Sequence, residues 1–343
     1  MSEDRRHNQH IVISRTDGIG DVTLTLPVAG VLKRHFPTCK VSFLGRDYTQ
    51  AIIAHCEHVD TCLSWDDLSA LSPKDQIRAF EKLEADVFIH VFPVKEIARL
   101  AKKAEIPIRI GTSHRVYHLN TCNKLINLGR KNSDLHEAQL NVKLLSPLGI
   151  TDEMSKDDIP ELYGFHSEEP LTPDGTSALD DSRFNLIIHP RSKGSAREWG
   201  VENYVQLLKL LPQDTFNVIL TGTKEEGAAI RGNLFSENPE LTDLSGRLDL
   251  AELINFIGHA DGLLAASTGP LHIASALGKH AIGIYAPRRP IHPVRWAPLG
   301  TQAKYFVLEK KCGECKNDEK CACIAAIPPQ EVLTHLLECS KGN

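Results

Sequence analysis

The chain has 343 residues, 41% of them hydrophobic, and a formal net charge of -5 at pH 7. This length is enough for two domains, each with its own core. The acidic balance argues against general nucleic-acid binding, and no apolar run is long enough to cross a bilayer. Because the polar N-terminus also lacks a signal-peptide pattern, we expect a cytoplasmic protein without a transmembrane segment.

The first half alternates short β-rich runs with helical stretches, which predicts a parallel sheet with helices on both faces. We expect strands near 11–14, 41–44, 87–91 and 108–110, and helices over 22–35 and 93–104.

The first predicted strand runs into a turn with two glycines, Arg15-Thr-Asp-Gly-Ile-Gly-Asp21. This turn brings Asp17 and Asp21 to the carboxyl end of the strand, where open α/β sheets bind their ligands. The third glycine of the dinucleotide fingerprint is missing, which disfavours a nicotinamide-dependent oxidoreductase. Asp21 could serve a ligand at this edge, or it could cap the helix that follows.

The stretch 95–131 holds nine Lys or Arg residues against two Glu. In a chain of negative net charge, this local excess suggests that an anionic acceptor binds the first domain. Two solvated helix faces would give the same composition.

From 151 to 182 the chain is acidic and rich in Pro, Ser, Asp and Gly, which is typical of a connection between domains. Strands near 185–189 and 216–220 then restart the pattern. We therefore expect two Rossmann-like domains: an N-terminal domain over 1–165, a linker over 166–184 and a C-terminal domain over 185–343. The last helix could pack back on the N-terminal domain.

The segment 190–199 directly follows a predicted strand and contains three cations and two serines around a glycine. Ser192, Lys193 and Arg197 make a credible clamp for a diphosphate, although a solvated basic loop would look the same. Farther on, Glu226 lies where a strand ends and a helix begins. Its carboxylate could accept a hydrogen bond from a ribose hydroxyl, or it could favour the helix N-terminus.

The run from Ala265 to Pro287 predicts a strand, a tight turn, a helix and a second strand. The turn, Ser267-Thr268-Gly269, would present hydroxyls and free backbone N–H groups to an anion at a helix N-terminus, and His272 follows. The alternative is an ordinary βα turn that binds nothing.

Nine cysteines, an odd number, fit a reducing compartment better than a disulfide framework. Cys312, Cys315, Cys321 and Cys323 could form a structural zinc site, or they could be thiols packed under a surface loop.

Taken together, Asp17-Gly-Ile-Gly-Asp21, the 190–199 turn and Ser267-Thr-Gly-Pro-Leu-His272 resemble the family 9 glycosyltransferases, which include the lipopolysaccharide heptosyltransferases. The resemblance implies a GT-B architecture: two Rossmann-like doubly wound domains facing a cleft, with the donor in the C-terminal half. It also implies inverting transfer that needs no metal or other cofactor. By position, Asp21 matches the catalytic aspartate. The donor-contacting positions correspond to Ser192, Arg197, Glu226, Thr268, Gly269 and His272.

This chain departs from the family pattern at three places. Ser267 stands where the family usually has Asp, Arg197 where it often has Lys, and Tyr285-Ala-Pro-Arg288 where it has Phe-Gly-Pro-Thr.

The sequence therefore predicts an inverting glycosyltransferase that moves a sugar from a nucleotide diphosphate to an anionic, lipopolysaccharide-type acceptor at the inner membrane. Heptose is one candidate sugar, and ADP-heptose one candidate donor. We assign acceptor binding to Asp17, Lys102, Lys103, Arg115 and His136. The alternative is a protein of the same fold that binds a nucleotide sugar without catalysis.

Overall fold

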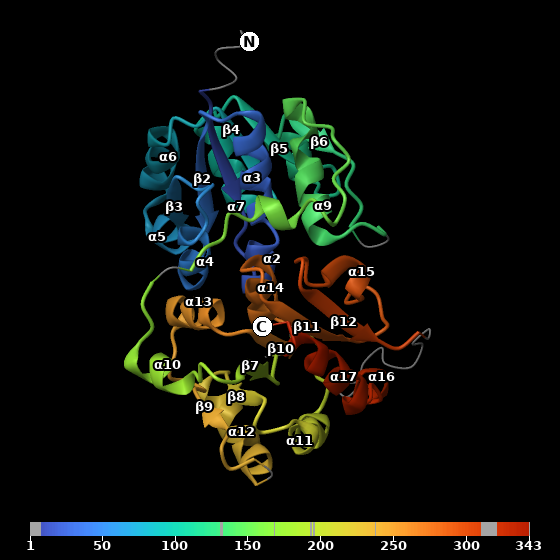
Figure 1. Cartoon of the computed structure of the whole chain (residues 1–343). Coiled ribbons are helices and arrows are strands. Elements are labelled where there is room, and N and C mark those ends of the chain that lie inside the picture. Colours follow the sequence, from blue (N-terminus) through green and yellow to red (C-terminus); the bar gives the residue numbers. More distant parts are fainter. Residues whose placement is uncertain are drawn as a thin grey trace. The chain divides into compact units, whose positions relative to one another are not determined.

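The computed structural model describes residues 8–130, 133–167, 169–192, 194, 196–236, 238–309 and 321–342. The chain divides into two compact units, Met1–His166 and Ser167–Asn343 (Figure 1). The segment expected as a linker belongs largely to the second unit, where Pro173–Ala178 forms helix α10. None of the described helices is both long enough and apolar enough to span a membrane.

The first unit contains a six-stranded parallel sheet in the order β3-β2-β1-β4-β5-β6. Its strands are β1 (His10–Ser14), β2 (Lys40–Gly45), β3 (Thr61–Ser64), β4 (Val87–His90), β5 (Ile108–Thr112) and β6 (Lys124–Ile126). Its α-helices are α2 (Ile19–Thr23), α3 (Leu26–His35), α4 (Gln50–Ala54), α5 (Trp65–Ala70), α6 (Pro73–Lys82), α7 (Lys95–Lys103), α8 (His118–Thr121) and α9 (Glu137–Val142).

The second unit repeats this plan with a six-stranded parallel sheet in the order β12-β11-β10-β7-β8-β9. Its strands are β7 (Phe184–His189), β8 (Phe216–Leu220), β9 (Thr242–Asp243), β10 (Gly262–Ala266), β11 (His280–Tyr285) and β12 (Ala303–Val307). Beside α10, its helices are α11 (Val201–Leu210), α12 (Lys224–Phe235), α13 (Leu250–His259), α14 (Gly269–Ala276), α15 (Pro293–Trp296), α16 (Ala322–Ala325) and α17 (Pro329–Cys339).

In both sheets the first and fourth strands of the unit are neighbours at the centre, and the chain winds outward from them in opposite directions. Ligands of such sheets bind beyond the carboxyl ends of these two strands, where the winding reverses. This edge follows β1 and β4 in the first unit, and β7 and β10 in the second.

The helix predicted over 22–35 is two helices, α2 and α3, separated near Leu24 and Thr25. Pro27 explains the break, because a proline has no backbone N–H to donate and is tolerated only in the first turn of a helix. Pro27 accordingly lies in the first turn of α3.

The core of the second unit joins α11 to the last helix. Val332 and Leu336 of α17 are buried there in one cluster with Trp199 and Tyr204, and α17 packs beside α11. The last helix, which we considered as a return to the N-terminal domain, thus packs within its own unit.

Candidate functional site

A buried arginine holds two carboxylates at the carboxyl end of β1. Arg15, with a side chain only 4% exposed, donates from Nε to Asp17 Oδ1 at 2.7 Å and from Nη2 to Asp21 Oδ1. The Asp21 side chain remains 28% exposed. Asp21 is therefore fixed by a charged partner behind it while part of its carboxylate stays accessible.

A third carboxylate joins this group from a distant part of the chain. Arg15 Nη1 donates to Glu137 Oε1 at 3.2 Å, and Glu137 is 1% exposed. Arg130 also pairs with Glu137, and its Nη1 donates to Asn141 Oδ1 at 2.9 Å. Asn141 in turn donates to the carbonyl of Leu24 at 3.0 Å, which ties α9 to the end of α2. The network fixes Arg15, and through it the position of Asp21.

Burial raises the pKa of Asp21 to about 6, although Arg15 opposes the shift. The neighbouring carboxylates of Asp17 and Glu137 add to the rise. Burial likewise raises the pKa of Asp17, against the effect of Arg15. An aspartate with a pKa near 6 is a better proton acceptor than an ordinary aspartate and is still ionised at pH 7.

The structure decides against the helix-cap interpretation of Asp21. Gly18 occupies the N-cap position of α2, and Asp21 is the third residue of the helix. Its carboxylate contacts Arg15 instead of capping the helix.

The predicted acceptor residues separate into different environments. His136 is fully buried, and its Nδ1 accepts the backbone N–H of Ala138 at the start of α9. The structure thus gives His136 a helix-capping role at the start of α9, and acceptor contact by this residue stays a prediction.

Lys102 and Lys103 lie in the last turn of α7, which leads to the amino end of β5. They are therefore remote from the sheet edge that carries Asp21, and Lys102 Nζ donates to the carbonyl of Asn120 at 2.7 Å. Acceptor binding by the two lysines stays a prediction, and it would have to take place away from that edge. Arg115 is exposed in the loop that leaves the carboxyl end of β5 and stays a candidate.

In the second unit, the turn after β7 is closed by Glu198. Glu198 Oε1 accepts the Ser192 backbone N–H at 2.9 Å, and its Oε2 pairs with Arg191 at 3.0 Å. The Ser192 hydroxyl donates to the carbonyl of Ala196 at 3.0 Å. Ser192 thus shapes the turn, while the predicted Lys193 lies outside the described residues.

Trp199 anchors the end of this turn. Its ring is fully buried against Tyr204, with centroids 5.1 Å apart, and its Nε1 donates to the Ile327 carbonyl at 2.9 Å. The turn therefore leaves β7 at the winding reversal and returns to a fixed point in the core.

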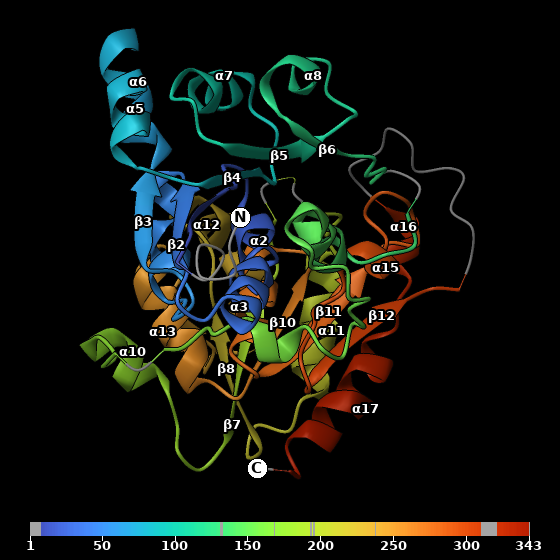
Figure 2. The same cartoon turned by 90° about the horizontal axis from the view of Figure 1, so that it is seen from above.

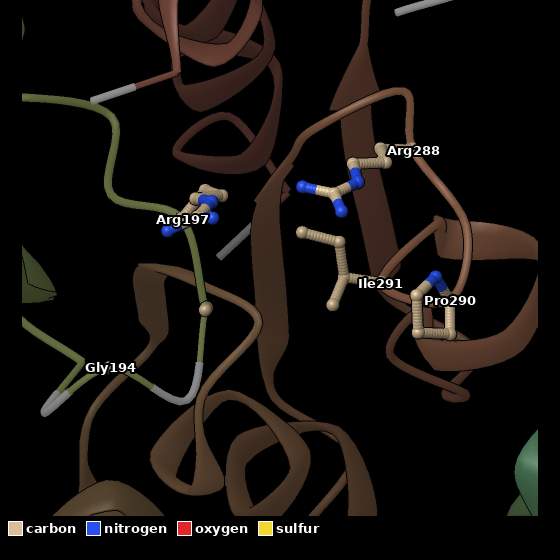
Figure 3. A pocket seen from close by; sticks show the side chains of 6 residues that line it. Gly194, Arg197, Arg288, Pro290 and Ile291 are labelled. Carbon is tan, nitrogen blue, oxygen red and sulfur yellow. The ribbon is translucent and has the colours of Figure 1, made fainter. Parts of the chain in front are cut away.

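Arg197 and Arg288 line a pocket of about 220 Å³, together with Gly194, Ala196, Pro290 and Ile291. Figure 3 shows the two guanidinium groups on opposite sides of this space. Its wall is braced by Trp296, whose Nε1 donates to the Pro290 carbonyl at 2.8 Å. Among the described residues that line this pocket there is no carboxylate, and its two guanidinium groups suit an anionic group such as a diphosphate.

The turn after β10 contains buried polar atoms without partners. Thr268 is the N-cap residue of α14, yet it makes no side-chain capping bond, and its hydroxyl has no hydrogen-bond partner. His272 Nδ1 is likewise buried and unpartnered, and burial lowers the pKa of His272 to about 4, so this ring is neutral at pH 7.

Buried polar groups are normally hydrogen-bonded, so an unpartnered hydroxyl at a helix N-terminus is suited to bind an anion. Gly269 is the first residue of α14, so Thr268 and Gly269 lie at a helix N-terminus as predicted. The hydroxyl of Ser267 instead bonds to that of Tyr285.

Glu226 forms a capping box with Thr223. Its Oε2 accepts the Thr223 backbone N–H at 2.8 Å, and the Thr223 hydroxyl accepts the Glu226 N–H at 3.3 Å. Glu226 therefore stabilises the N-terminus of α12, and its contact with a ribose hydroxyl stays a prediction.

Cys312 and Cys315 lie outside the described residues, whereas Cys321 and Cys323 are buried in the core of the second unit. Across the described parts of the chain, no group of three His, Cys, Asp or Glu side chains is arranged to hold a metal ion. With two of the four cysteines undescribed, the zinc site also stays a prediction.

Sequence reasoning missed Arg15, Glu137 and Arg130 as members of the site. The only local signal was a charged residue directly after a buried strand at Arg15, a position where a charge must find a partner.

Comparison with known proteins agrees with this architecture. The family model of glycosyltransferase family 9 (heptosyltransferase) matches residues 77–324. A Haemophilus influenzae protein described as a glycosyltransferase is 25% identical over 333 residues, which cover 89% of this chain and 90% of the relative. Lipopolysaccharide heptosyltransferase 3 of Escherichia coli K12 is 22% identical, over 78% and 79% of the two chains.

Solved structures show the same fold. The glycosyltransferase family 9 protein of Veillonella parvula superposes with a TM-score of 0.78 at 17% identity, covering 98% of both chains. The E. coli heptosyltransferase WaaC, solved with ADP, gives a TM-score of 0.71 at 15% identity, covering 96% of this chain and 99% of WaaC. The predicted α/β fold of the GT-B class, with two Rossmann-like domains, is confirmed. The chain belongs to glycosyltransferase family 9, the heptosyltransferase family, and is a glycosyltransferase.

Proposed function

We propose that this enzyme transfers a sugar, with inversion and without a metal ion, from a nucleoside diphosphate to an anionic glycolipid. The observation that carries the proposal is the accessible Asp21 carboxylate, which Arg15 holds at the winding reversal of the first sheet. Its pKa of about 6 suits a general base at neutral pH.

In the proposed reaction, Asp21 takes the proton of an acceptor hydroxyl as the hydroxyl oxygen attacks the anomeric carbon. The new bond forms on the face opposite the diphosphate, and the bond from the anomeric carbon to the diphosphate oxygen breaks. Negative charge grows on the leaving diphosphate, which Arg197 and Arg288 are placed to stabilise.

On the donor side, the proposal rests on the two turns at the winding reversal of the second sheet. The Thr268 hydroxyl and the N-terminus of α14 would bind the diphosphate, with Arg197 as counter-charge. WaaC has been solved with ADP and with ADP-2-deoxy-2-fluoro heptose, which makes ADP-heptose the first donor to test. We propose a cytoplasmic enzyme, because the odd number of cysteines fits a reducing compartment.

The decisive experiment compares Asp21→Asn with Asp66→Asn. Asp66 is a matched control, because it also lies in the first turn of a helix, pairs with an arginine and is 29% exposed. We expect kcat at saturating substrates to fall at least about a hundredfold in Asp21→Asn, the loss typical of a missing general base, and to be unchanged in Asp66→Asn. Donor affinity, measured by calorimetry, should be unchanged in both.

Turnover by Asp21→Asn near the wild-type rate would place the base elsewhere, with Asp17 as the next residue to test. A wild-type protein that binds nucleotide sugars but transfers no sugar to any acceptor would instead favour a binding protein of the same fold.

A further inference from the structure

Three large apolar side chains are exposed together around helix α8. Val116 precedes the helix and is 79% exposed, Leu119 lies within it at 57%, and Leu125 on the neighbouring strand β6 is 39% exposed. Burying such side chains is worth about 1.5–3 kcal/mol each, so exposing three together points to a surface that binds something.

Sheet register places Leu125 on the same face as the helix. Gly111 of β5 is the register partner of Leu125, and a Cβ at Gly111 would lie 2.6 Å from His118 Nδ1 of α8. Register partners in a parallel sheet point to the same face, so Leu125 points to the side that α8 covers. Figure 2 shows α8 beside α7, over the edge formed by β5 and β6. We call this corner, with its apolar side chains Val116, Leu119 and Leu125, the α8 surface.

Basic side chains border the α8 surface. Arg115 and Lys124 are exposed next to its apolar residues, and Lys102 reaches α8 through its bond to the Asn120 carbonyl. Within the described ranges, these three cations form no ion pair with a carboxylate, whereas Arg130 of the same basic stretch is paired with Glu137. Unpaired cations around exposed apolar side chains match a bilayer that offers both acyl chains and anionic headgroups.

One end of the α8 surface lies near the edge of the sheet where chemistry is expected. Arg115 and Val116 belong to the loop that leaves β5 at its carboxyl end, and β5 is separated from β1 only by β4. The carboxyl end of β1 carries Asp21. Lys102 and Lys124 lie toward the amino ends of β5 and β6, so a docked bilayer would run along the α8 side of the sheet and reach the Asp21 edge only at this loop.

We propose that the α8 surface docks this enzyme on an anionic lipid bilayer. Leu119 and Val116 insert among the acyl chains, while Arg115, Lys124 and Lys102 contact the anionic headgroups. The docking itself rests on the α8 surface alone, and its effect on turnover rests also on the proposed function.

Vesicle co-sedimentation of the full chain tests the docking. We expect binding to vesicles of phosphatidylglycerol in phosphatidylcholine, weaker binding to phosphatidylcholine alone, and weakening by salt. Val116→Ser with Leu119→Ser should lower the affinity at least about tenfold, because two apolar side chains no longer insert. Arg115→Glu with Lys124→Glu should lower it by a similar factor, and only this effect should disappear at high salt.

The matched controls carry the same exchanges on the second unit. Leu210→Ser replaces a 38% exposed leucine, and Lys304→Glu reverses an exposed cation. Neither should change vesicle binding. Equal binding by all variants would overturn the proposal. So would concentration-dependent self-association through Val116 and Leu119, seen by light scattering, without vesicle binding.

Turnover separates this inference from the proposed function. Val116→Ser with Leu119→Ser should keep wild-type kcat on a water-soluble acceptor fragment and lose activity on acceptor embedded in vesicles. If the wild-type protein transfers no sugar, the proposed function fails while co-sedimentation still decides the docking.

Discussion

Arg15 and Glu137 lie 122 positions apart in the sequence, yet Arg15 Nη1 donates to Glu137 Oε1 at 3.2 Å inside the first unit. Both side chains are almost fully buried, at 4% and 1% exposed. Arg15 forms ion pairs with three carboxylates, those of Asp17, Asp21 and Glu137. Because the negative charge of Glu137 offsets part of the positive charge of Arg15, Arg15 can orient Asp21 without strongly lowering the pKa of Asp21. Glu137 is thus a positioning residue for Asp21.

The buried pair should be important for stability. Glu137→Gln removes the charge that compensates Arg15 and Arg130, and we expect the free energy of unfolding to fall by about 3 kcal/mol, as when one partner of a buried ion pair is removed. Urea denaturation measures the loss. Glu161→Gln is the control, because Glu161 is 80% exposed and lies 3.7 Å from Arg34. A change of equal size in the two variants would contradict the special role of the buried pair.

The pH dependence of catalysis should report Asp21. We expect kcat to rise as the pH increases through about 6, because Asp21 accepts a proton only when it is ionised. In Glu137→Gln this acidic limb should move to lower pH, since the negative charge of Glu137 helps to raise the pKa of Asp21. The measurement is kcat at saturating substrates over a pH series. A limb at the same pH in both proteins would show that Glu137 does not act on the base.

Asp21 should also lower the stability of the folded protein. Its pKa is about 6 in the folded chain and 3.8 in the unfolded chain, so between these values the folded chain binds more protons at this site. The ionised carboxylate therefore costs stability above about pH 6, and this cost disappears as the pH falls toward 4. We expect Asp21→Asn to be at least as stable as wild type above pH 6, with the advantage shrinking below it.

Urea midpoints of both proteins over this pH range measure that difference. A strongly destabilised Asp21→Asn protein at neutral pH would mean that the ion pair with Arg15 outweighs the cost of burial.

Removing two buried hydroxyls in turn, one at the N-cap of α14 and one in its last turn, distinguishes a role in donor binding from a role in packing. Thr268→Val removes an unpartnered hydroxyl at the N-terminus of the helix, so stability should hold while donor affinity falls about tenfold or more. Ser275→Ala removes another unpartnered hydroxyl from the last turn of the same helix and should leave the affinity unchanged. Calorimetry with the nucleoside diphosphate checks both, and equal affinities in the two variants would remove Thr268 from the donor site.

Sequence patterns located the turns because strand, turn and helix follow one another within a few residues. Asp21 after β1 and Thr268 before α14 lie where the local pattern predicted them. The edge strands β3 and β6 escaped prediction, because they are partly exposed and lack the apolar run of a central strand. The pairing of Arg15 with Glu137 has no local signature at all, since only the folded chain brings the two together.

Counting charges along the sequence does not show where each charged side chain lies in the fold. It treated the basic stretch as one surface, although Lys102 and Lys103 lie in the last turn of α7, which leads to the amino end of β5 and away from the Asp21 edge. The capping role of His136 was not predicted either, because a histidine before a helix can either face solvent or cap the helix.

The bond between Trp296 and Pro290 gives the proposed donor pocket an intrinsic fluorescent probe. Of the three tryptophans in the chain, Trp65 and Trp199 are buried in cores, whereas Trp296 bonds to the wall of the pocket that Arg197 and Arg288 line. The Arg295 guanidinium lies 4.8 Å from the centroid of its ring. Any anion that draws Arg288 and Pro290 inward would alter the surroundings of this indole. Its emission could then follow nucleotide capture in real time, without a label on enzyme or sugar.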